Sequence, residues 1–522
     1  MWAFNTHIIE LRDMNICLVK PPILHKGASF ALMPTPPLGL AFIAGALKAQ
    51  GHHIHVVDAS AEGAGEINHF RAEIYVFGLP KEQIVDLIPE DADCICFSFM
   101  FTNNWLYGRE VVHAVRERFP DAILIAGGEH ATAAPKFCLD QSPLDFIVLG
   151  EGEETIVELI DVLERNGDID TVAGIAYQRN GEFVQRKNRK RITKVSDIPW
   201  PAWENFPLDK YFANRMTHGV YRGNTLPVMA TRGCPYTCTF CSNPLMWGKA
   251  YEMRDPKEFV DELEFLHKTY SVVNFDFYDL TAMMVKEWII EMCNEIVARG
   301  MKINYQLPSG TRAEVIDFEV AQALYQSGCI NITYAPESGA PGVLHAVKKQ
   351  VNIKEMLQSI KYANKAGMII HLNMILGFPN DTHKDLWQTI WFLVRCSWYG
   401  AHDMAPAVFT PYPGSTLYNR LVKQGKLDLY DDNSIIEIIE SYDLWPSRVY
   451  NEQMSETALK IYIFLFTLAF YGSNYIFRPN RLFKTIRNLI ISKHESRLEQ
   501  ILYKNFIRNF LDIFTLRSKT SI

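Results

Sequence analysis

Short apolar runs and helical segments alternate along most of this chain. Residues 15–165 contain five runs rich in isoleucine, valine and phenylalanine, such as NICLVKPP and AILIAGG, separated by helical segments such as TIVELIDVLERNG. Continuous apolar runs are typical of strands buried on both faces, and strands that alternate with helices form parallel sheets. The pattern predicts an α/β fold that begins with a Rossmann-like doubly wound domain, in which ligands bind at the carboxyl ends of the strands.

The alternation starts again after a polar segment. Six further apolar runs follow from Leu226 onward, and a helical segment comes after each of them. Six β/α units predict a partial barrel, in which functional side chains lie at the carboxyl ends of the strands. We therefore expect a doubly wound domain at 1–165, a linker at 166–221, a partial barrel at 222–430 and a helical region at 431–522.

Composition limits the classes of partner and the place in the cell. The chain has 522 residues, of which 48% are hydrophobic, and its net charge is −7, so nothing in the overall charge favours a nucleic-acid partner. The first residues, MWAFNTHIIELRD, carry charges too early for a secretory signal peptide, and we expect a cytoplasmic protein. The apolar run 461–477 is interrupted by GSN, which favours a buried or interfacial helix over a membrane span.

Three of the ten cysteines, Cys234, Cys238 and Cys241, lie within eight positions in the segment TRGCPYTCTFCSN. No other cysteine or histidine follows until His267, so the segment lacks the fourth ligand of a closed zinc site. A cubane iron–sulfur cluster normally takes one thiolate on each of its four irons. Three thiolates would leave one iron open for a substrate or a cofactor.

The Cys-x-x-x-Cys-x-x-Cys spacing, with an aromatic residue before the last cysteine, resembles the signature of the radical S-adenosylmethionine (SAM) enzymes. In that family the three thiolates hold a 4Fe-4S cluster, and the open iron binds the amino and carboxylate groups of SAM. The resemblance implies that residues beside the cluster and at the strand ends bind SAM. These residues are Phe240, Asp279, Arg312, Glu337, Ser338 and Gly377.

The residue types suit the groups that SAM presents. Glu337 can accept hydrogen bonds from hydroxyl or ammonium groups, Arg312 can pair with a carboxylate, and the turn at Gly377 can admit the adenine. For Asp279 and Arg312 an ordinary ion pair at the barrel mouth is the alternative, and the glycine can equally mark a turn. The stretch YAPESG also departs from the commoner Gly-x-Glu-Ser-Gly, which leaves the contact of the glutamate open.

The loops after the strands of the first domain are rich in glycine, which lets backbone approach a ligand closely. Singly, the segments MPTPPLGL, GGEHATAAP and GEGEET read as tight turns. Together, and ahead of the cysteines, they resemble the cobalamin-binding domain of one large radical SAM class. The resemblance implies a cobalamin site formed by Pro37, Leu38, Ser98, Gly127, Gly128, His130, Thr132, Gly150, Glu151 and Gly152.

Cobalamin-dependent mutases place a histidine from an Asp-x-His-x-x-Gly motif below the cobalt. The only Asp-x-His of this chain lies in DTHKDL, where Leu386 occupies the glycine position. We therefore expect no histidine from that motif on the lower face. His130 is expected to be a hydrogen-bonding residue near the nucleotide tail.

The last segment, 478–522, is strongly basic, with ten Lys and Arg against three Asp and Glu. Basic and apolar residues alternate there as in a helix at a membrane surface, and a helical lid packed on the barrel is the alternative. The first of these would give the protein a peripheral membrane contact through its carboxyl-terminal tail.

The combined resemblance implies a cobalamin-dependent radical SAM methyltransferase. A deoxyadenosyl radical would remove a hydrogen from an unactivated carbon, and methylcobalamin would supply the methyl group. The cofactors are then a 4Fe-4S cluster, SAM and cobalamin, and the partners are a small-molecule or lipid-like substrate and an electron donor such as flavodoxin or ferredoxin. An oxidative cyclase or ring-rearranging enzyme that uses cobalamin, a methylthiotransferase and a non-catalytic cobalamin sensor remain as alternatives.

Overall fold

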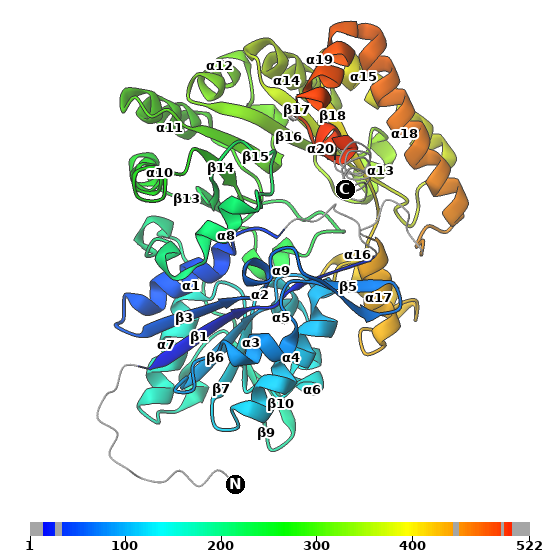
Figure 1. Cartoon of the computed structure of the whole chain (residues 1–522). Coiled ribbons are helices and arrows are strands. Elements are labelled where there is room, and N and C mark those ends of the chain that lie inside the picture. The colour runs from blue at the N-terminus through cyan, green and yellow to red at the C-terminus, as the bar shows by residue number, and fades with distance from the viewer. Residues whose placement is uncertain (1–13, 27–33, 442–447, 492–494, 504–522) are drawn as a thin grey trace, which may run out of the picture.

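Two α/β units lie one above the other, and the long carboxyl-terminal helix Glu456–Phe477 runs along one side of the upper unit (Figure 1). The computed structural model describes residues 14–26, 34–441, 448–491 and 495–503. The predicted α/β class is confirmed, with a doubly wound unit, a partial barrel and a helical carboxyl-terminal region.

The amino-terminal unit is built on a seven-stranded sheet with the order β10-β9-β8-β7-β6-β1-β3. Its parallel strands are the five predicted apolar runs: β1 (Asn15–Lys20), β3 (His53–Asp58), β6 (Cys94–Ser98), β7 (Ile123–Gly127) and β8 (Phe146–Val148). In chain order these strands are arranged 2-1-3-4-5, a doubly wound order that creates a crevice at the carboxyl ends. The sheet is covered by α1 (Leu38–Lys48), α3 (Lys81–Asp86), α4 (Trp105–Arg118), α5 (Glu129–Ala133), α6 (Pro135–Gln141) and α7 (Glu153–Glu164).

Part of the predicted linker belongs to this sheet. β9 (Ile175–Arg179) and β10 (Glu182–Gln185) pair antiparallel at its edge. They were not predicted because half of their side chains face solvent and are polar, which hides the apolar alternation. A separate antiparallel sheet, β2 (Ile23–Lys26), β4 (Ile67–Arg71) and β5 (Ile74–Phe77), was not predicted either.

The second unit is the predicted six-stranded parallel barrel. Its strands, in spatial and chain order, are β11 (Thr225–Val228), β14 (Asn274–Phe277), β15 (Asn304–Thr311), β16 (Cys329–Glu337), β17 (Ile369–Leu376) and β18 (Asp403–Val408). Its outer helices are α10 (Pro256–Tyr270), α11 (Lys286–Ala298), α12 (Phe318–Gln326), α14 (Ile353–Ala366) and α15 (His383–Tyr399).

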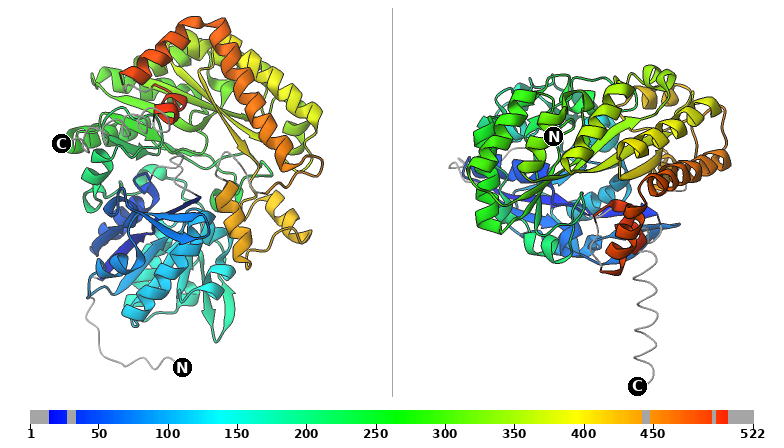
Figure 2. Two further views of the ribbon diagram at one scale, coloured as in Figure 1. Left: turned by 45° about the vertical axis from the view of Figure 1, so that its right-hand side comes forward. Right: turned by 90° about the horizontal axis from the view of Figure 1, so that it is seen from above.

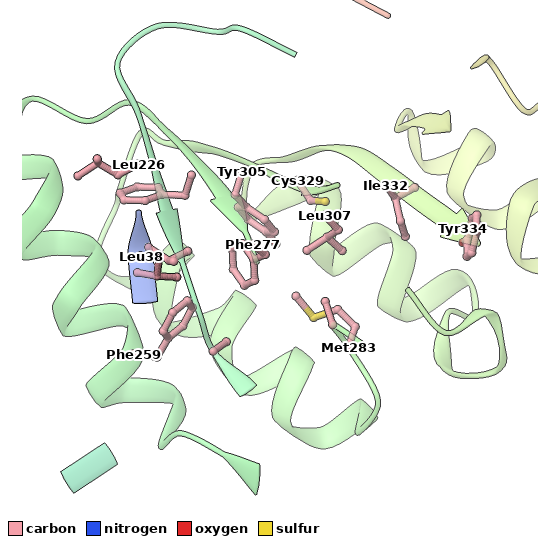
Figure 3. Close-up of a cluster of buried hydrophobic side chains, with 14 of the residues drawn as sticks. Leu38, Leu226, Phe259, Phe277, Met283, Tyr305, Leu307, Cys329, Ile332 and Tyr334 are labelled. Atoms are coloured by element: carbon pink, nitrogen blue, oxygen red, sulfur yellow. The ribbon is translucent and has the colours of Figure 1, made fainter. Parts of the chain in front are cut away.

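The hydrophobic core continues from one unit into the other. Leu38 of α1 belongs to the same buried cluster as Leu226, Phe259 and Phe277 of the barrel, as Figure 3 shows. Apolar burial stabilises by about 25 cal/mol per Å². The shared cluster therefore holds the two units against each other.

The helical region beyond residue 430 is divided between both units. α17 (Asp432–Ser441) packs on the amino-terminal unit, where Asp432 pairs with Arg71 and Arg109 at 2.7 and 2.6 Å. In contrast, α18 (Glu456–Phe477) packs against α15 and β18, and α19 (Pro479–Ile490) and α20 (Arg497–Leu502) follow it. By length and composition α18 could cross a membrane, but one side of it lies in the barrel core.

A buried ion-pair cluster joins the two units beside this core. Arg232, in the two-residue strand β12 (Thr231–Arg232), contacts Glu153 at 2.6 Å and Glu151 at 3.3 Å. Its guanidinium also lies 4.9 Å from the ring centre of Phe42 in α1. The two carboxylates are almost fully buried; Arg232 compensates Glu153, and it shares the compensation of Glu151 with Arg191.

We predict that Arg232→Met lowers the free energy of unfolding by about 3–5 kcal/mol, because it leaves the Glu153 carboxylate buried without its cation and removes one of the two cations that contact Glu151. Urea unfolding of the variant beside the parent protein measures the loss. Arg118→Met is the matched control, since Arg118 forms an exposed pair with Glu90 and its loss should cost less than about 1 kcal/mol. Equal midpoints for the two variants would contradict the prediction.

Candidate cofactor site at the domain interface

The carboxyl ends of both parallel sheets meet at the interface between the units. The loop that carries the three cysteines lies against the loops after β7 and β8: Ser242 donates a hydrogen bond to Glu129, and a Cβ added at Gly150 would lie 3.4 Å from the carbonyl oxygen of Met246. The loop after β18 also reaches across, since a Cβ at Gly414 would lie 3.2 Å from Cβ of Ala133. The two predicted ligand sites therefore face each other.

The cysteine loop is held by backbone hydrogen bonds that leave its thiols unbonded to one another. The amide of Thr239 donates to the carbonyl of Val347 at 3.0 Å, and the amide of Leu417 donates to the carbonyl of Thr239 at 2.9 Å. Cys234, Cys238 and Cys241 are half-buried and free. Because these hydrogen bonds with other segments fix the loop, the three thiols are held in position without a bound metal.

The surroundings of the thiols fit a cluster of several irons. Burial raises the pKa of Cys241 to about 12 and raises that of Cys238, and the neighbouring thiols add to both shifts. Bound iron would offset this cost by stabilising the thiolates. In the described parts of the chain, no three His, Cys, Asp or Glu side chains are arranged around a single ion. A cubane does not require that arrangement, since each thiolate binds a different iron.

Arg312 presents a free donor at the barrel mouth. Its guanidinium stacks 4.1 Å from the ring centre of Tyr236 in the cysteine loop, and Nη2 donates to Glu314 and to the carbonyl of Gln350. Its Nε is buried and has no hydrogen-bond partner among the described residues. A buried donor without a partner is costly, and the carboxylate of a ligand would satisfy it.

Glu337 ends β16 in a strained conformation next to the cysteine loop. Its φ of +63° lies in the left-handed region, which is costly for a residue other than glycine and is common at functional sites. Burial raises the pKa of its carboxyl, and Lys349 opposes the shift from 2.7 Å. The ammonium of Lys349 also lies 6.0 Å from the ring centre of Phe240, so this pair borders the cluster position.

Three other residues predicted to bind SAM have structural partners. Asp279 accepts hydrogen bonds from the amide and hydroxyl of Thr231 at 2.5 and 2.6 Å, and burial raises its pKa to about 6. Ser338 bonds with Thr389 at 3.1 Å. Gly377 has φ +80°, and a Cβ there would come within 2.6 Å of a side-chain carbon of Leu459. These contacts give the three residues a role in shaping the barrel mouth, and direct contact with SAM remains a prediction for them.

The loops predicted to hold cobalamin converge at one edge of the seven-stranded sheet. The amide of His130 donates to the carbonyl of Phe99 at 3.1 Å, which joins the loops after β6 and β7. The amide of Gly150 donates to the hydroxyl of Thr132 at 3.0 Å, which joins the loops after β7 and β8. The remaining predicted residues lie in these loops, at strand ends or at the start of α1: Pro37, Leu38, Ser98, Gly127, Gly128 and Gly152.

The His130 side chain turns into the helix layer. Its Nδ1 lies 3.0 Å from the hydroxyl of Thr102, and its ring packs on those of Trp105 and Phe137. Burial lowers the pKa of His130 to about 3, so the imidazole is neutral. Its Nε2 is buried without a hydrogen-bond partner in the described structure.

Glu151 has a task that the sequence did not indicate. Its carboxylate contacts Arg232, accepts from Nε of Arg191 at 2.5 Å and accepts from the amide of Ile192 at 3.1 Å. These contacts occupy the Glu151 carboxylate and tie the units together, and a contact of Glu151 with cobalamin remains a prediction. Arg191 comes from the basic run of the predicted linker and also donates to the carbonyl of Trp247, next to the cysteine loop.

Comparisons with known proteins agree with this two-site arrangement. The family model "B12 binding domain" matches residues 31–160, and the model "Radical SAM superfamily" matches residues 228–393. The chain is 28% identical to an uncharacterized methyltransferase of Pyrococcus horikoshii over 80% of this chain and 85% of that protein. It is 29% identical to the anaerobic magnesium-protoporphyrin IX monomethyl ester cyclase of Cereibacter sphaeroides over 79% and 64%.

A solved structure has the same fold. The radical SAM methyltransferase TsrM from Kitasatospora setae, with cobalamin and a [4Fe-4S] cluster bound, superposes with a TM-score of 0.64 at 14% identity, over 79% of this chain and 75% of that one. The two family models follow each other in the order of the two predicted ligand sites, and the three free thiols and the glycine loops lie where the models match. The chain belongs to the cobalamin-dependent radical SAM enzymes.

Proposed function

We propose that the protein is a methyltransferase that methylates an unactivated carbon with the help of a 4Fe-4S cluster, SAM and cobalamin. One observation carries the proposal: the cysteine loop rests directly on the glycine loops of the B12-binding domain, with Ser242 bonded to Glu129. A radical source and a methyl source on loops that contact each other suit transfer of a methyl group to a carbon radical. When bound, the cluster would supply the electron that cleaves SAM to a deoxyadenosyl radical, and cobalamin would supply the methyl group.

The residues of the chain bind and orient these groups. Cys234, Cys238 and Cys241 would hold three irons, and the free Nε of Arg312 would pair with the SAM carboxylate. Glu337 would accept from the SAM ammonium or a ribose hydroxyl, with its orientation fixed by Lys349. The reaction needs an electron donor such as flavodoxin or ferredoxin. We propose that it takes place in the cytoplasm, with a peripheral contact to the membrane.

Oxidative cyclisation is the second candidate, because the chain also resembles a cyclase. A methylthiotransferase would need a second cluster in the first domain. The sulfur atoms of Cys94 and Cys96 lie 3.7 Å apart, but these two residues, like Cys17 and Cys138, are buried in the core of the first unit. This placement argues against a second cluster formed by these four thiols.

The test is transfer of an isotopic label. The holoenzyme is incubated with a reductant, SAM that carries a trideuterated methyl group, and an extract of cells that lack the gene. We expect a product that has gained a trideuterated methyl group, detected by mass spectrometry. A product that has lost hydrogens and carries no label would replace methyl transfer with cyclisation.

Replacing Cys234, Cys238 and Cys241 together with alanine should abolish the visible iron–sulfur absorbance of the reconstituted protein. Cobalamin binding should persist, because the glycine loops belong to the other unit. Ala substitution of the buried Cys293, which bonds to Tyr305 inside the barrel, is the matched control and should keep the cluster. Reductive cleavage of SAM by the triple variant would refute the assignment of the cluster ligands.

Cobalamin should bind with its dimethylbenzimidazole tail off the cobalt and without a histidine in its place. The Asp-x-His sequence of the chain lies at the start of α15 in the barrel, and Nδ1 of His383 is 2.9 Å from the hydroxyl of Tyr462. His130 faces Thr102 in the helix layer. Paramagnetic resonance of the cob(II)alamin form measures the axial ligand, and splitting by one axial nitrogen would contradict this prediction.

A further inference from the structure

The outer side of α15 exposes three tryptophans. Trp387, Trp391 and Trp398 are 56, 64 and 62% exposed, although large aromatic side chains usually lie mostly buried. Their spacing places them along one side of the helix, away from the barrel strands. In contrast, Trp105 and Trp203 are fully buried.

The neighbouring helix α18 continues this apolar surface. From Ile461 to Phe477 its sequence has no charged residue. The side toward the barrel is buried, whereas Ile461, Phe464, Leu468 and Ile476 are each more than half exposed. The exposed side therefore lacks the charged residues that an ordinary surface helix presents to solvent.

The two exposed rows lie side by side. The rings of Trp387 and Tyr462 are 6.3 Å apart at one end of the helix pair, and those of Trp398 and Phe477 are 4.9 Å apart at the other. α18 forms the right-hand edge of the molecule in Figure 1, and Figure 2 shows α15 and α18 beside each other from two further directions. We call this surface the tryptophan face; its members are Trp387, Trp391, Trp398, Ile461, Phe464, Leu468 and Ile476.

Cations accompany the apolar residues. α19 follows α18 directly and exposes Phe483, Ile486 and Ile490, and the exposed basic side chains of Lys484 and Arg487 alternate with them. Lys484 pairs with Glu495 at 2.6 Å, so Arg487 is the cation of this helix on which the argument rests. No acidic residue occurs in the sequence of α19. Apolar and aromatic side chains next to basic ones are the composition of helices that lie on anionic membranes.

We propose that the tryptophan face docks onto the surface of an anionic lipid bilayer, with α19 beside it. The helices lie on the bilayer and do not cross it, because the other side of α18 is fixed to the barrel: Asn474 donates to the carbonyl of Ala401 at 2.6 Å. The uncharged run and the flanking cations match lipid tails and anionic headgroups, respectively. The sequence predicted a membrane contact through the basic tail; the proposed contact instead includes α15 of the barrel. Residues 504–522 of that tail lie outside the described structure.

Vesicle sedimentation tests the proposal with the full-length holoenzyme. Vesicles of phosphatidylglycerol and phosphatidylcholine should bind the protein at low salt, and pure phosphatidylcholine vesicles should bind it less. Brominated lipids should quench part of the tryptophan fluorescence, since only exposed tryptophans would reach the acyl chains. Binding should weaken as salt rises, because charges are screened within about 10 Å at 0.1 M ionic strength.

Variants identify the face. Trp387→Ser combined with Trp391→Ser should weaken partitioning at least about tenfold through lost apolar burial, and should reduce the quenching to what Trp398 alone contributes. Arg487→Gln should weaken binding about fivefold at low salt and much less at high salt. The controls are Leu87→Ser and Val297→Ser, which remove side chains that are 43 and 54% exposed elsewhere, and which should bind like the parent.

Two outcomes would overturn the proposal. One is the absence of vesicle binding and quenching at low salt by a folded parent protein. The other is a homodimer in sedimentation velocity that the double tryptophan variant dissociates, which would assign the face to a second copy of the chain. All readouts are binding or association, so they stand or fall independently of methyl transfer.

Discussion

The buried guanidinium of Arg232 is the contact on which the geometry of the interface depends. It comes from the short strand β12, which leads into the cysteine loop, and it meets two carboxylates at the start of α7 in the other unit. Burying three charges is costly unless each is compensated, so this cluster tolerates little displacement. The ion pairs fix the distance between the cysteine loop and the glycine loops, while burial of the shared apolar core stabilises the association of the two units.

Strain and unpaired polar atoms also occur at the strand ends where the predicted ligand sites lie. The left-handed backbone at Glu337, the free Nε of Arg312 and the free Nε2 of His130 all lie at the carboxyl ends of strands. Elsewhere the barrel strands are filled by side chains such as Phe277 and Tyr305, which have conventional packing. Backbone strain and unpaired buried atoms persist when the surrounding structure enforces them, and a ligand bound at these strand ends would offset their cost in free energy.

Local pattern predicted the strands well, because burial on two faces is visible in the chain itself. The cysteine spacing likewise pointed to three thiols that are free and partly buried on one loop, and their role as cluster ligands stays a prediction. Apolar runs located β1, β3, β6, β7 and β8, and the six barrel strands. Roles that depend on a partner distant in sequence were not predictable. Glu151 was assigned to cobalamin because of its glycine neighbours, but its partner Arg232 is 81 residues away. The exposure of the three tryptophans was not predictable for the same reason, since it depends on which side of α15 packs against the barrel.

The position of α17 has a consequence for how the protein is made. This helix lies near the end of the chain, yet Ile435 and Ile439 are buried in the core of the amino-terminal unit. Domains tend to fold as they leave the ribosome, at about 5–20 residues per second. The first unit therefore emerges with an uncovered apolar surface and keeps it on the order of half a minute at those rates, until the barrel has been synthesised. The nascent chain passes through a stage in which its oldest domain is exposed to aggregation and to chaperones.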